Sequence, residues 1–170
     1  MRGATSGRKY TRVATGGTFD HFHAGHRHLL ERSFELGDEV VIGLTSDEFA
    51  RKEGKVPQEP FGQRKARLEA YIRKSFPGRR YIIAKLDDYF GPGIASKDVE
   101  ALVASPETGK RVELANELRA RKGFPRLELV VVDWVFAEDG RPISSSRIRN
   151  GEIDEDGRLI GGESPARRAG

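Results

Sequence analysis

The sequence contains no cysteine among its 170 residues. Without thiols the chain can form neither a disulfide framework nor a thiolate nucleophile, which leaves a cytoplasmic location as the expectation. No run approaches the roughly 18 apolar residues that would cross a membrane, so no membrane partner is expected. Met1 to Tyr10 is basic and rich in glycine and serine but lacks the apolar segment of a secretory signal. We expect residues 1–10 to form a flexible basic arm.

Neither sign of charge is in large excess. The 30 lysines and arginines stand against 26 acidic residues, for a formal net charge of +4, and the two signs are interspersed. This pattern favours small polyanionic ligands over nucleic acid. A chain of this length buries roughly two-thirds of its unfolded surface, enough for one core. We expect a single domain over residues 11–152 and, because residues 153–170 are polar and rich in glycine, a disordered tail after it.

Two kinds of apolar segment alternate along the chain. Runs of β-branched residues are typical of buried parallel strands, whereas apolar residues three or four positions apart indicate helices. Their alternation predicts an α/β fold, a Rossmann-like, doubly wound parallel sheet of five strands with helices on both faces. Trp134 is expected in the core rather than stacked on a ligand, and Arg64, Lys65 and Arg67 on a solvated helix face. The expected strands are Arg12–Thr15, Glu39–Leu44, Arg80–Lys85, Glu100–Ala104 and Leu127–Phe136, and the expected helices include Phe61–Phe76 and one from Pro106 to about Lys122.

The stretch TGGTFDHFHAGH, residues 15–26, follows the first expected strand. Its two adjacent glycines lack a Cβ atom, so the backbone can turn sharply and an anion can approach the N–H groups. Thr18 adds a hydroxyl donor. His23 and His26 share one side of the first turn of the helix that follows, where free N–H groups and the helix dipole favour phosphate. Histidine donates hydrogen bonds there and adds a charge when protonated, so the stretch predicts a phosphate site.

Other interpretations of this stretch remain open. Histidine pairs at this spacing can bind zinc, although the chain offers neither a cysteine nor an H-E-x-x-H arrangement. The stretch could also be a plain structural turn. His21 and His28 are expected to be surface or packing residues. The adjacent Asp87 and Asp88 lack a third ligand at a suitable spacing, so no metal site is expected there.

Lysines follow the second expected strand in a polar loop from Arg51 to Pro60. In open α/β sheets ligands bind beyond the carboxyl ends of the strands, so Lys52 or Lys55 could reach a phosphate from this loop. The alternative for each lysine is a solvated position.

A second polar signature, ISSSRIRNG, occupies residues 143–151. One serine would suffice to cap a short helix. Three hydroxyls (Ser144, Ser145 and Ser146), free backbone N–H groups and two arginines, Arg147 among them, predict a second phosphate clamp, with simple capping as the alternative. Both signatures follow strand ends, so they can converge on one cleft.

Residues 17–20 and 23–26 resemble the G-T-F-D and H-x-G-H motifs of the nucleotidyltransferase superfamily, and residues 143–149 are similar to its I-S-S/T-x-x-R-like turn. Over residues 10–154 the chain looks closest to the archaeal phosphopantetheine adenylyltransferases, with supporting segments at residues 41–49, 105–108 and 137–149. The resemblance implies transfer of AMP from ATP to 4'-phosphopantetheine, giving dephospho-coenzyme A and pyrophosphate.

The resemblance also implies roles for individual residues. His26 and His23 would contact the α-phosphate and bridging oxygens, Thr18 would orient the acceptor phosphate, and Lys52 or Lys55 would steady the pentacoordinate state. Mg²⁺ would bind through the substrate phosphates without a carboxylate cage of its own. The remaining residues of the implied ATP site are Gly17, Phe19, Gly25, Ser144, Ser145, Ser146 and Arg147, the last four holding the leaving pyrophosphate.

Alternatives within and outside the superfamily stay open. The first two motifs are also similar to those of cytidylyltransferases and archaeal FAD synthetases, and a non-catalytic nucleotide-binding module is possible. The triphosphate consumed and the acceptor that releases pyrophosphate would discriminate these functions. The chain has Ser105–Thr108 where the bacterial enzymes carry a G-L-R segment. Arg111 and Arg119 are the candidates to replace that arginine, and neither the oligomeric state nor the pantetheine pocket can be read from the sequence.

Overall fold

The computed structural model describes residues 7–89 and 91–160. Its strands are β1 (Tyr10–Gly17), β2 (Gly37–Thr45), β3 (Arg80–Leu86), β4 (Ala101–Ala104) and β5 (Glu128–Val131). Its helices are α1 (Ala24–Leu36), α2 (Asp47–Lys52), α3 (Phe61–Ser75), α4 (Pro92–Ala95), α5 (Pro106–Gly109), α6 (Val112–Arg121) and α7 (Ser145–Arg149).

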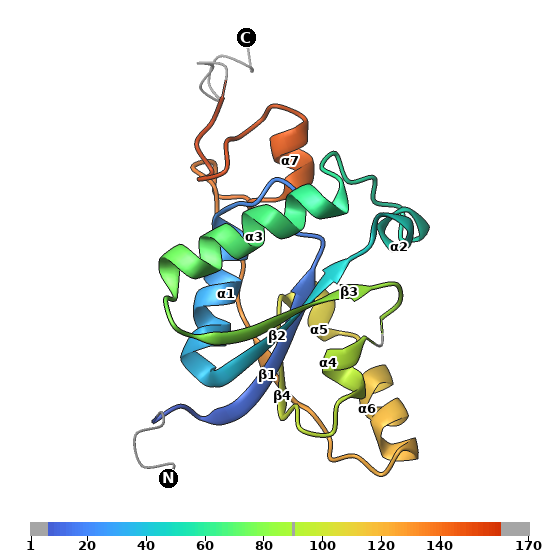
Figure 1. Cartoon of the computed structure of the whole chain (residues 1–170). Coiled ribbons are helices and arrows are strands. Elements are labelled where there is room, and N and C mark those ends of the chain that lie inside the picture. Colours follow the sequence, from blue (N-terminus) through green and yellow to red (C-terminus); the bar gives the residue numbers. More distant parts are fainter. Residues whose placement is uncertain (1–6, 90, 161–170) are drawn as a thin grey trace.

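All five strands form one sheet in the order β3-β2-β1-β4-β5, and every neighbouring pair is parallel. Helices connect successive strands and cover the sheet from both sides (Figure 1). The predicted Rossmann-like α/β fold is therefore confirmed. None of the helices in the described part of the chain is long and apolar enough to cross a membrane.

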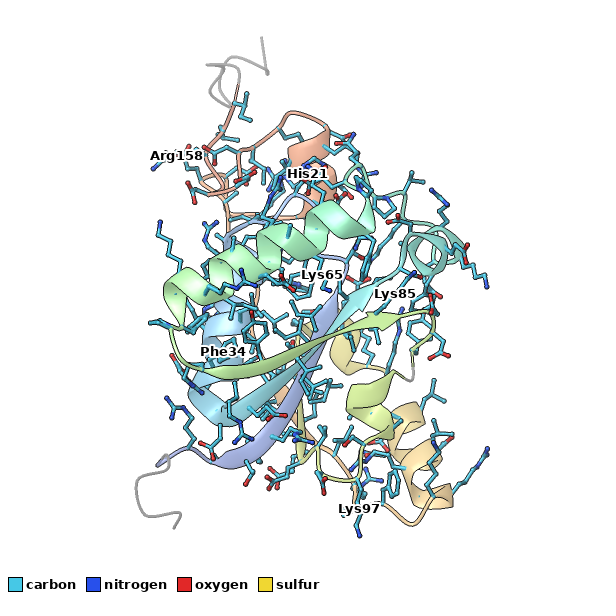
Figure 2. The ribbon with its side chains drawn as sticks, in the orientation of Figure 1. His21, Phe34, Lys65, Lys85, Lys97 and Arg158 are labelled. Carbon is cyan, nitrogen blue, oxygen red and sulfur yellow. The ribbon has the colours of Figure 1, made fainter. Side chains whose placement is uncertain are left out.

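Two apolar clusters hold the helices on the sheet. Leu30 and Phe34 recur four positions apart on α1, as Leu68 and Ile72 do on α3, and all four are buried against side chains of β1, β2 and β4. Phe34 lies between α1 and the sheet (Figure 2). Each such side chain contributes about 1.5–3 kcal/mol on burial. The second cluster packs α6 against the opposite face of the sheet.

The carboxyl ends of β1 and β2 lie at one edge of the sheet, where Gly17 pairs in register with Leu44. The loop from β1 to α1 and the segment from α2 to α3 therefore start side by side. This edge brings together the glycine-rich stretch and the lysine loop of the sequence.

Strand β5 is much shorter than the apolar run Leu127–Phe136 predicts. It pairs through four residues with β4 alone, at the edge of the sheet. Val131 is 51% exposed and Trp134 46% exposed, so the run is not buried on both faces. The predicted core position of Trp134 is wrong, because β5 ends at Val131 and Trp134 lies in the exposed segment that follows the strand.

The helix expected from Pro106 to Lys122 is interrupted. The Ser105 hydroxyl accepts a hydrogen bond from the Thr108 N–H, which begins α5 as predicted, but α5 ends at Gly109 and α6 starts anew at Val112.

Residues 153–160 pack on the domain, in contrast to the expected tail. Ile153 is fully buried beside Ala137 and Ile143. The Glu155 carbonyl accepts a hydrogen bond from the Ala24 N–H at 2.9 Å, which ties this segment to the start of α1. Residues 161–170 lie outside the described part. At the other end, Tyr10 begins β1, and residues 1–6 of the expected arm lie outside the described part.

Candidate active site

His23 and His26 cap the first turn of α1 through a reciprocal pair of hydrogen bonds. His23 is the N-cap residue, and its Nδ1 accepts a hydrogen bond from the Gly25 N–H at 3.1 Å. In return the His23 N–H donates to His26 Nδ1 at 3.2 Å. This is a capping box built from two histidines. Since both Nδ1 atoms accept, the neutral rings carry their proton on Nε2, and each ring keeps one N–H donor for a ligand.

The two rings are stacked, and their environment keeps them uncharged. Their centroids lie 3.7 Å apart at an angle of 21°, and His26 also contacts the rings of Phe19 and Phe22. Burial, and then the charge of Arg27, lower the pKa of His23 to about 4. Burial and the neighbouring His23 place the pKa of His26 well below its usual value. In the unliganded protein near neutral pH the pair therefore offers hydrogen-bond donors rather than the charge expected from protonated histidine.

Because Gly25 has no side chain, the His23 ring can pack closely against its backbone. A Cβ atom at this position would lie 2.9 Å from His23 Cε1. Any larger residue would push the ring away from the first turn of α1. The glycine of the H-x-G-H motif is thus required by the close approach of the first histidine.

The loop between β1 and α1 is held in an unusual conformation. Phe19 and His21 have φ angles of +52° and +48°, which non-glycine residues adopt rarely. The Asp20 carboxylate accepts hydrogen bonds from the N–H groups of Gln58 and Glu59, at 3.0 and 3.1 Å. His21 lies near α3 and α7 in Figure 2, and its N–H donates to the Glu59 carboxylate. The ring of Phe19 is 1% exposed, so this predicted ATP-site residue can meet a ligand through its backbone only.

Arg64 joins the walls of the site from inside. Its side chain is fully buried, so its predicted place on a solvated helix face is wrong. The guanidinium donates to the carbonyl oxygens of Thr18 and Thr45, at 2.7 and 2.8 Å, and to the Asp47 carboxylate at 2.6 Å. Lys65 and Arg67 are partly exposed as predicted. Arg64 thereby fixes the ends of β1 and β2 relative to each other.

The second signature lies against the first. Ser144 caps α7 by accepting a hydrogen bond from the Arg147 N–H at 3.2 Å, and the Ser145 hydroxyl donates to the Asp20 carbonyl at 2.7 Å. The two motifs, 125 residues apart in sequence, are thus in direct contact. The side chain of Ser146 is left exposed at the start of α7. The structure brings the predicted serines and histidines to one edge of the sheet.

The guanidinium of Arg147 is already occupied. It forms ion pairs with Asp139 and with Glu152, the latter at 2.8 Å, and donates to the Pro142 carbonyl at 3.1 Å. Arg149, two residues on, behaves differently: its Nη1 donates to the Val56 carbonyl at 3.3 Å, and its buried Nε has no hydrogen-bond partner among the described residues. Both arginines belong to the predicted phosphate clamp, but only Arg147 was assigned to the ATP site; the unpaired Nε of Arg149 could be found only in the structure.

A cavity of about 270 Å³ opens beside the glycine-rich loop. Thr18 and Lys55 line it, whereas Lys52 does not. Most of its remaining wall is apolar. Ala14, Val41 and Leu102 contribute from the sheet, and Leu114 and Ala115 contribute from α6. Sequence reasoning could not find this pocket, because its apolar lining looks like ordinary core in the sequence.

Arg111 and Arg119, the two candidates to replace the arginine of the bacterial enzymes, already have partners in the protein. Arg119 is 1% exposed, and its guanidinium donates to carbonyl oxygens that include those of Ile94, Ser96 and Val99. Arg111 lines the cavity but pairs with Glu53 at 3.7 Å. Arg119 therefore has a structural role at the base of α6.

Among residues 7–89 and 91–160 no group of three or more histidine, cysteine or acidic side chains could hold a metal ion. The zinc alternative for His23 and His26 accordingly lacks a third ligand, and both Nδ1 atoms are engaged by backbone N–H groups.

Comparison with known proteins agrees with this geometry. The cytidylyltransferase-like family model matches residues 14–151. A crystal structure of a protein of unknown function from Archaeoglobus fulgidus superimposes with a TM-score of 0.64 at 33% identity, over 72% of this chain and 90% of that one. A tyrosyl-tRNA synthetase from the same organism reaches a TM-score of 0.62 at 14% identity, over 95% of this chain and 64% of that one, and so shares the fold alone. Fold, motifs and family model define a nucleotidyltransferase.

Curated relatives narrow the class. The phosphopantetheine adenylyltransferase of Methanothermobacter thermautotrophicus is 46% identical over 153 residues, 90% of this chain and 92% of the relative. That of Methanopyrus kandleri is 44% identical over 147 residues, 86% of this chain and 93% of the relative. The chain belongs to the archaeal phosphopantetheine adenylyltransferase family.

Proposed function

We propose that this protein transfers the AMP group of ATP to 4'-phosphopantetheine and releases pyrophosphate. The observation that carries the proposal is the apolar cavity that opens beside Thr18 and Lys55, next to the loop that leads to the histidine pair. Such a cavity fits the largely apolar arm of the acceptor, with the acceptor phosphate at the Thr18 end.

The reaction is an in-line displacement at the α-phosphorus. An oxygen of the acceptor phosphate attacks, a new P–O bond forms, and the bond from the α-phosphorus to the bridging oxygen breaks, so that pyrophosphate departs with that electron pair. The attacking oxygen already carries negative charge and needs no base. The protein supplies alignment and donors for the charge that gathers on the transferring and leaving groups.

The histidine pair supplies donors at the transferring group. We assign the Nε2–H groups of His23 and His26 to the α-phosphate and bridging oxygens. Protonation of either ring at Nδ1 would break the hydrogen bond that this atom accepts from the backbone, so the rings act as neutral donors. Their stacked, capped arrangement fixes both donors before the substrate arrives.

Lys55 and Thr18 act on the acceptor side of this scheme. Both line the cavity, and Lys55 lies close enough to His26 that its charge contributes to the lowered pKa of that ring. We therefore assign the cation that steadies the pentacoordinate state to Lys55. Lys52 does not line the cavity and is the weaker candidate.

The leaving pyrophosphate is assigned to α7. Ser146 is the exposed serine of the three, and Arg149 is the arginine with an unpaired Nε. Ser144 and Ser145 shape this wall through their backbone and through the bonds they already make. Arg147 holds the wall in place through its two carboxylates.

Magnesium would enter with ATP. The lack of an acidic cluster in the described residues fits a cation held by phosphate oxygens rather than by a protein cage. When bound, it would neutralise charge on the phosphates. The proposed reaction needs ATP and 4'-phosphopantetheine, and it is consistent with a cytoplasmic enzyme that has no nucleic-acid or membrane partner.

The test is pyrophosphate release with 4'-phosphopantetheine as acceptor, comparing ATP with CTP. Release with ATP alone is expected, and His26→Ala should reduce the rate by about 10²–10³-fold, the typical loss of one transition-state donor. Turnover of CTP instead would favour the cytidylyltransferase alternative. An unchanged rate in His26→Ala would contradict the assigned role of the histidine pair.

A further inference from the structure

Three side chains from separate segments meet at the edge of the acceptor cavity. Glu53 follows α2, Tyr89 follows β3, and Arg111 precedes α6, and all three line the cavity. We refer to Glu53, Tyr89 and Arg111 as the cover.

The members of the cover contact one another. The guanidinium carbon of Arg111 lies 4.0 Å from the centroid of the Tyr89 ring, and its Nη2 lies 3.7 Å from Glu53 Oε2. A hydrogen bond from the Tyr89 hydroxyl to the Glu53 carboxylate raises the pKa of that hydroxyl. Phe49 of α2 meets the Tyr89 ring edge-on at 4.8 Å. These contacts connect α2 with the start of α6 across the cavity.

Exposure shows that the cover faces solvent on one side and the cavity on the other. The side chain of Arg111 is 47% exposed and that of Glu53 is 32% exposed. An ion pair as exposed as Arg111–Glu53 adds little stability, so it can open to admit a ligand and form again over it. The ring of Tyr89 and the stem of Arg111 would then provide apolar contact to what lies beneath.

Charge within the cover is balanced, which limits what it can hold. Glu53 neutralises Arg111, so the cover presents no net cation to a second phosphate. The arm of the acceptor carries amide groups and no charge, and these groups can pair with either member. The cover therefore suits a neutral chain with hydrogen-bonding groups.

We infer that Tyr89, Arg111 and Glu53 are positioning residues that close over the arm of the acceptor and set the affinity for it. This inference rests on the proposed function, because it takes the cavity as the acceptor site. It assigns these residues no part in ATP binding or in phosphoryl chemistry.

The test separates acceptor affinity from catalysis. Tyr89→Ala and Arg111→Met should each raise the KM for 4'-phosphopantetheine about tenfold, as expected for the loss of one aromatic or stacked contact. Both should leave kcat and the KM for ATP within about twofold of wild type. Tyr89→Phe keeps the ring and should lie closer to wild type than Tyr89→Ala. The double variant should lose less than the product of the single losses, because Tyr89 and Arg111 act through one contact.

Arg126→Met is the matched control. Arg126 pairs with Glu113 of α6 at 3.1 Å, an exposed ion pair outside the cavity lining. This variant should match wild type in both KM values. Circular dichroism should show that all variants are folded.

The outcomes distinguish the two proposals. If wild type turns over ATP with 4'-phosphopantetheine but Tyr89→Ala and Arg111→Met keep the wild-type acceptor KM, the cover is refuted and the proposed function stands. Equal rises in the KM for ATP and for the acceptor would also refute it, since they would indicate a general structural effect. If calorimetry and turnover show no interaction of wild type with 4'-phosphopantetheine, the proposed function and the cover both fail.

Discussion

Acidification should destabilise this protein through its histidine pair, and the loss should begin below pH 6.5, before most carboxylates titrate. The pKa of His23 is lowered from 6.5 to about 4 in the folded chain, chiefly because the ring is buried at 6% exposure. Between pH 6.5 and about 4 the unfolded chain binds a proton at His23, whereas the folded chain does not. The stability contributed by the neutral ring is therefore complete above pH 6.5 and is lost as the pH falls toward 4.

The size of this effect follows from the same two values. At about 1.4 kcal/mol per pH unit, the difference between 6.5 and 4 corresponds to about 3 kcal/mol. Between pH 7 and pH 4.5 most of it, about 2 kcal/mol, should disappear from the free energy of unfolding. His26, whose pKa is lowered in the same direction, adds to the loss.

Urea unfolding at pH 7.0, 5.5 and 4.5, without substrates, measures the slope. His23→Asn keeps a good N-cap residue but removes the titrating ring, so this variant should lose clearly less stability than wild type on acidification. His28→Asn, at an exposed position of the same helix, should lose as much as wild type. Equal losses in wild type and His23→Asn would refute the view that burial keeps this ring neutral.

Further predictions follow from single contacts. Arg64→Met should lower the free energy of unfolding by about 3–5 kcal/mol, because it leaves the carbonyl oxygens of Thr18 and Thr45 and the Asp47 carboxylate without their donor. Lys65→Met on the same helix removes only an exposed ion pair with Glu69 and should cost less than about 1 kcal/mol. Chemical denaturation of both variants measures the two costs, and equal costs would contradict this prediction. Lys55→Met should lower kcat for pyrophosphate release about a hundredfold, because Lys55 lines the cavity. Lys52→Met should leave kcat near wild type, because Lys52 does not line it. A larger loss in Lys52→Met than in Lys55→Met would show that the wrong lysine was assigned. Gly16→Ala would place a Cβ atom 2.9 Å from the Gly43 carbonyl oxygen of β2 and should lower the free energy of unfolding by about 1–3 kcal/mol. The measurement is the midpoint of chemical unfolding, and an unchanged midpoint would mean that β1 and β2 separate easily.

The arrangement of the sheet could be predicted from the sequence because its signals are local. β-branched runs at residues 39–44 and 80–85 alternate with helical spacing, and all neighbouring strands proved parallel. Parallel strands place their carboxyl ends at one edge, so the meeting of the two phosphate signatures followed from the fold. The contact between Ser145 and Asp20 confirms that meeting.

Features that depend on tertiary neighbours could not be predicted. Arg64 looks like a surface residue until the carbonyl oxygens of Thr18 and Thr45 are placed beside it. The apolar run that contains Trp134 cannot reveal that its strand ends at Val131 and lies at the edge of the sheet. Ile153 is a lone apolar residue in a polar segment, and its burial depends on Ala137 and Ile143 rather than on any periodic pattern.

The choice between Arg147 and Arg149 illustrates the same limit. Both arginines follow the serines, and both match the expectation of a phosphate clamp. Two positions apart on a helix, they point in different directions. Partners from other segments decide their roles: Asp139 and Glu152 occupy the first, whereas Nε of the second is left unpaired within the described chain.

The fate of the α-phosphorus tests the central claim most directly. ATP labelled with ³²P at the α position should be incubated with the protein, magnesium and 4'-phosphopantetheine, and compared with ATP labelled at the γ position. The α label should appear in dephospho-coenzyme A, and the γ label in pyrophosphate, in equal amounts. Transfer of the γ label to the acceptor, or release of the α label as free AMP without an adenylylated product, would contradict the account.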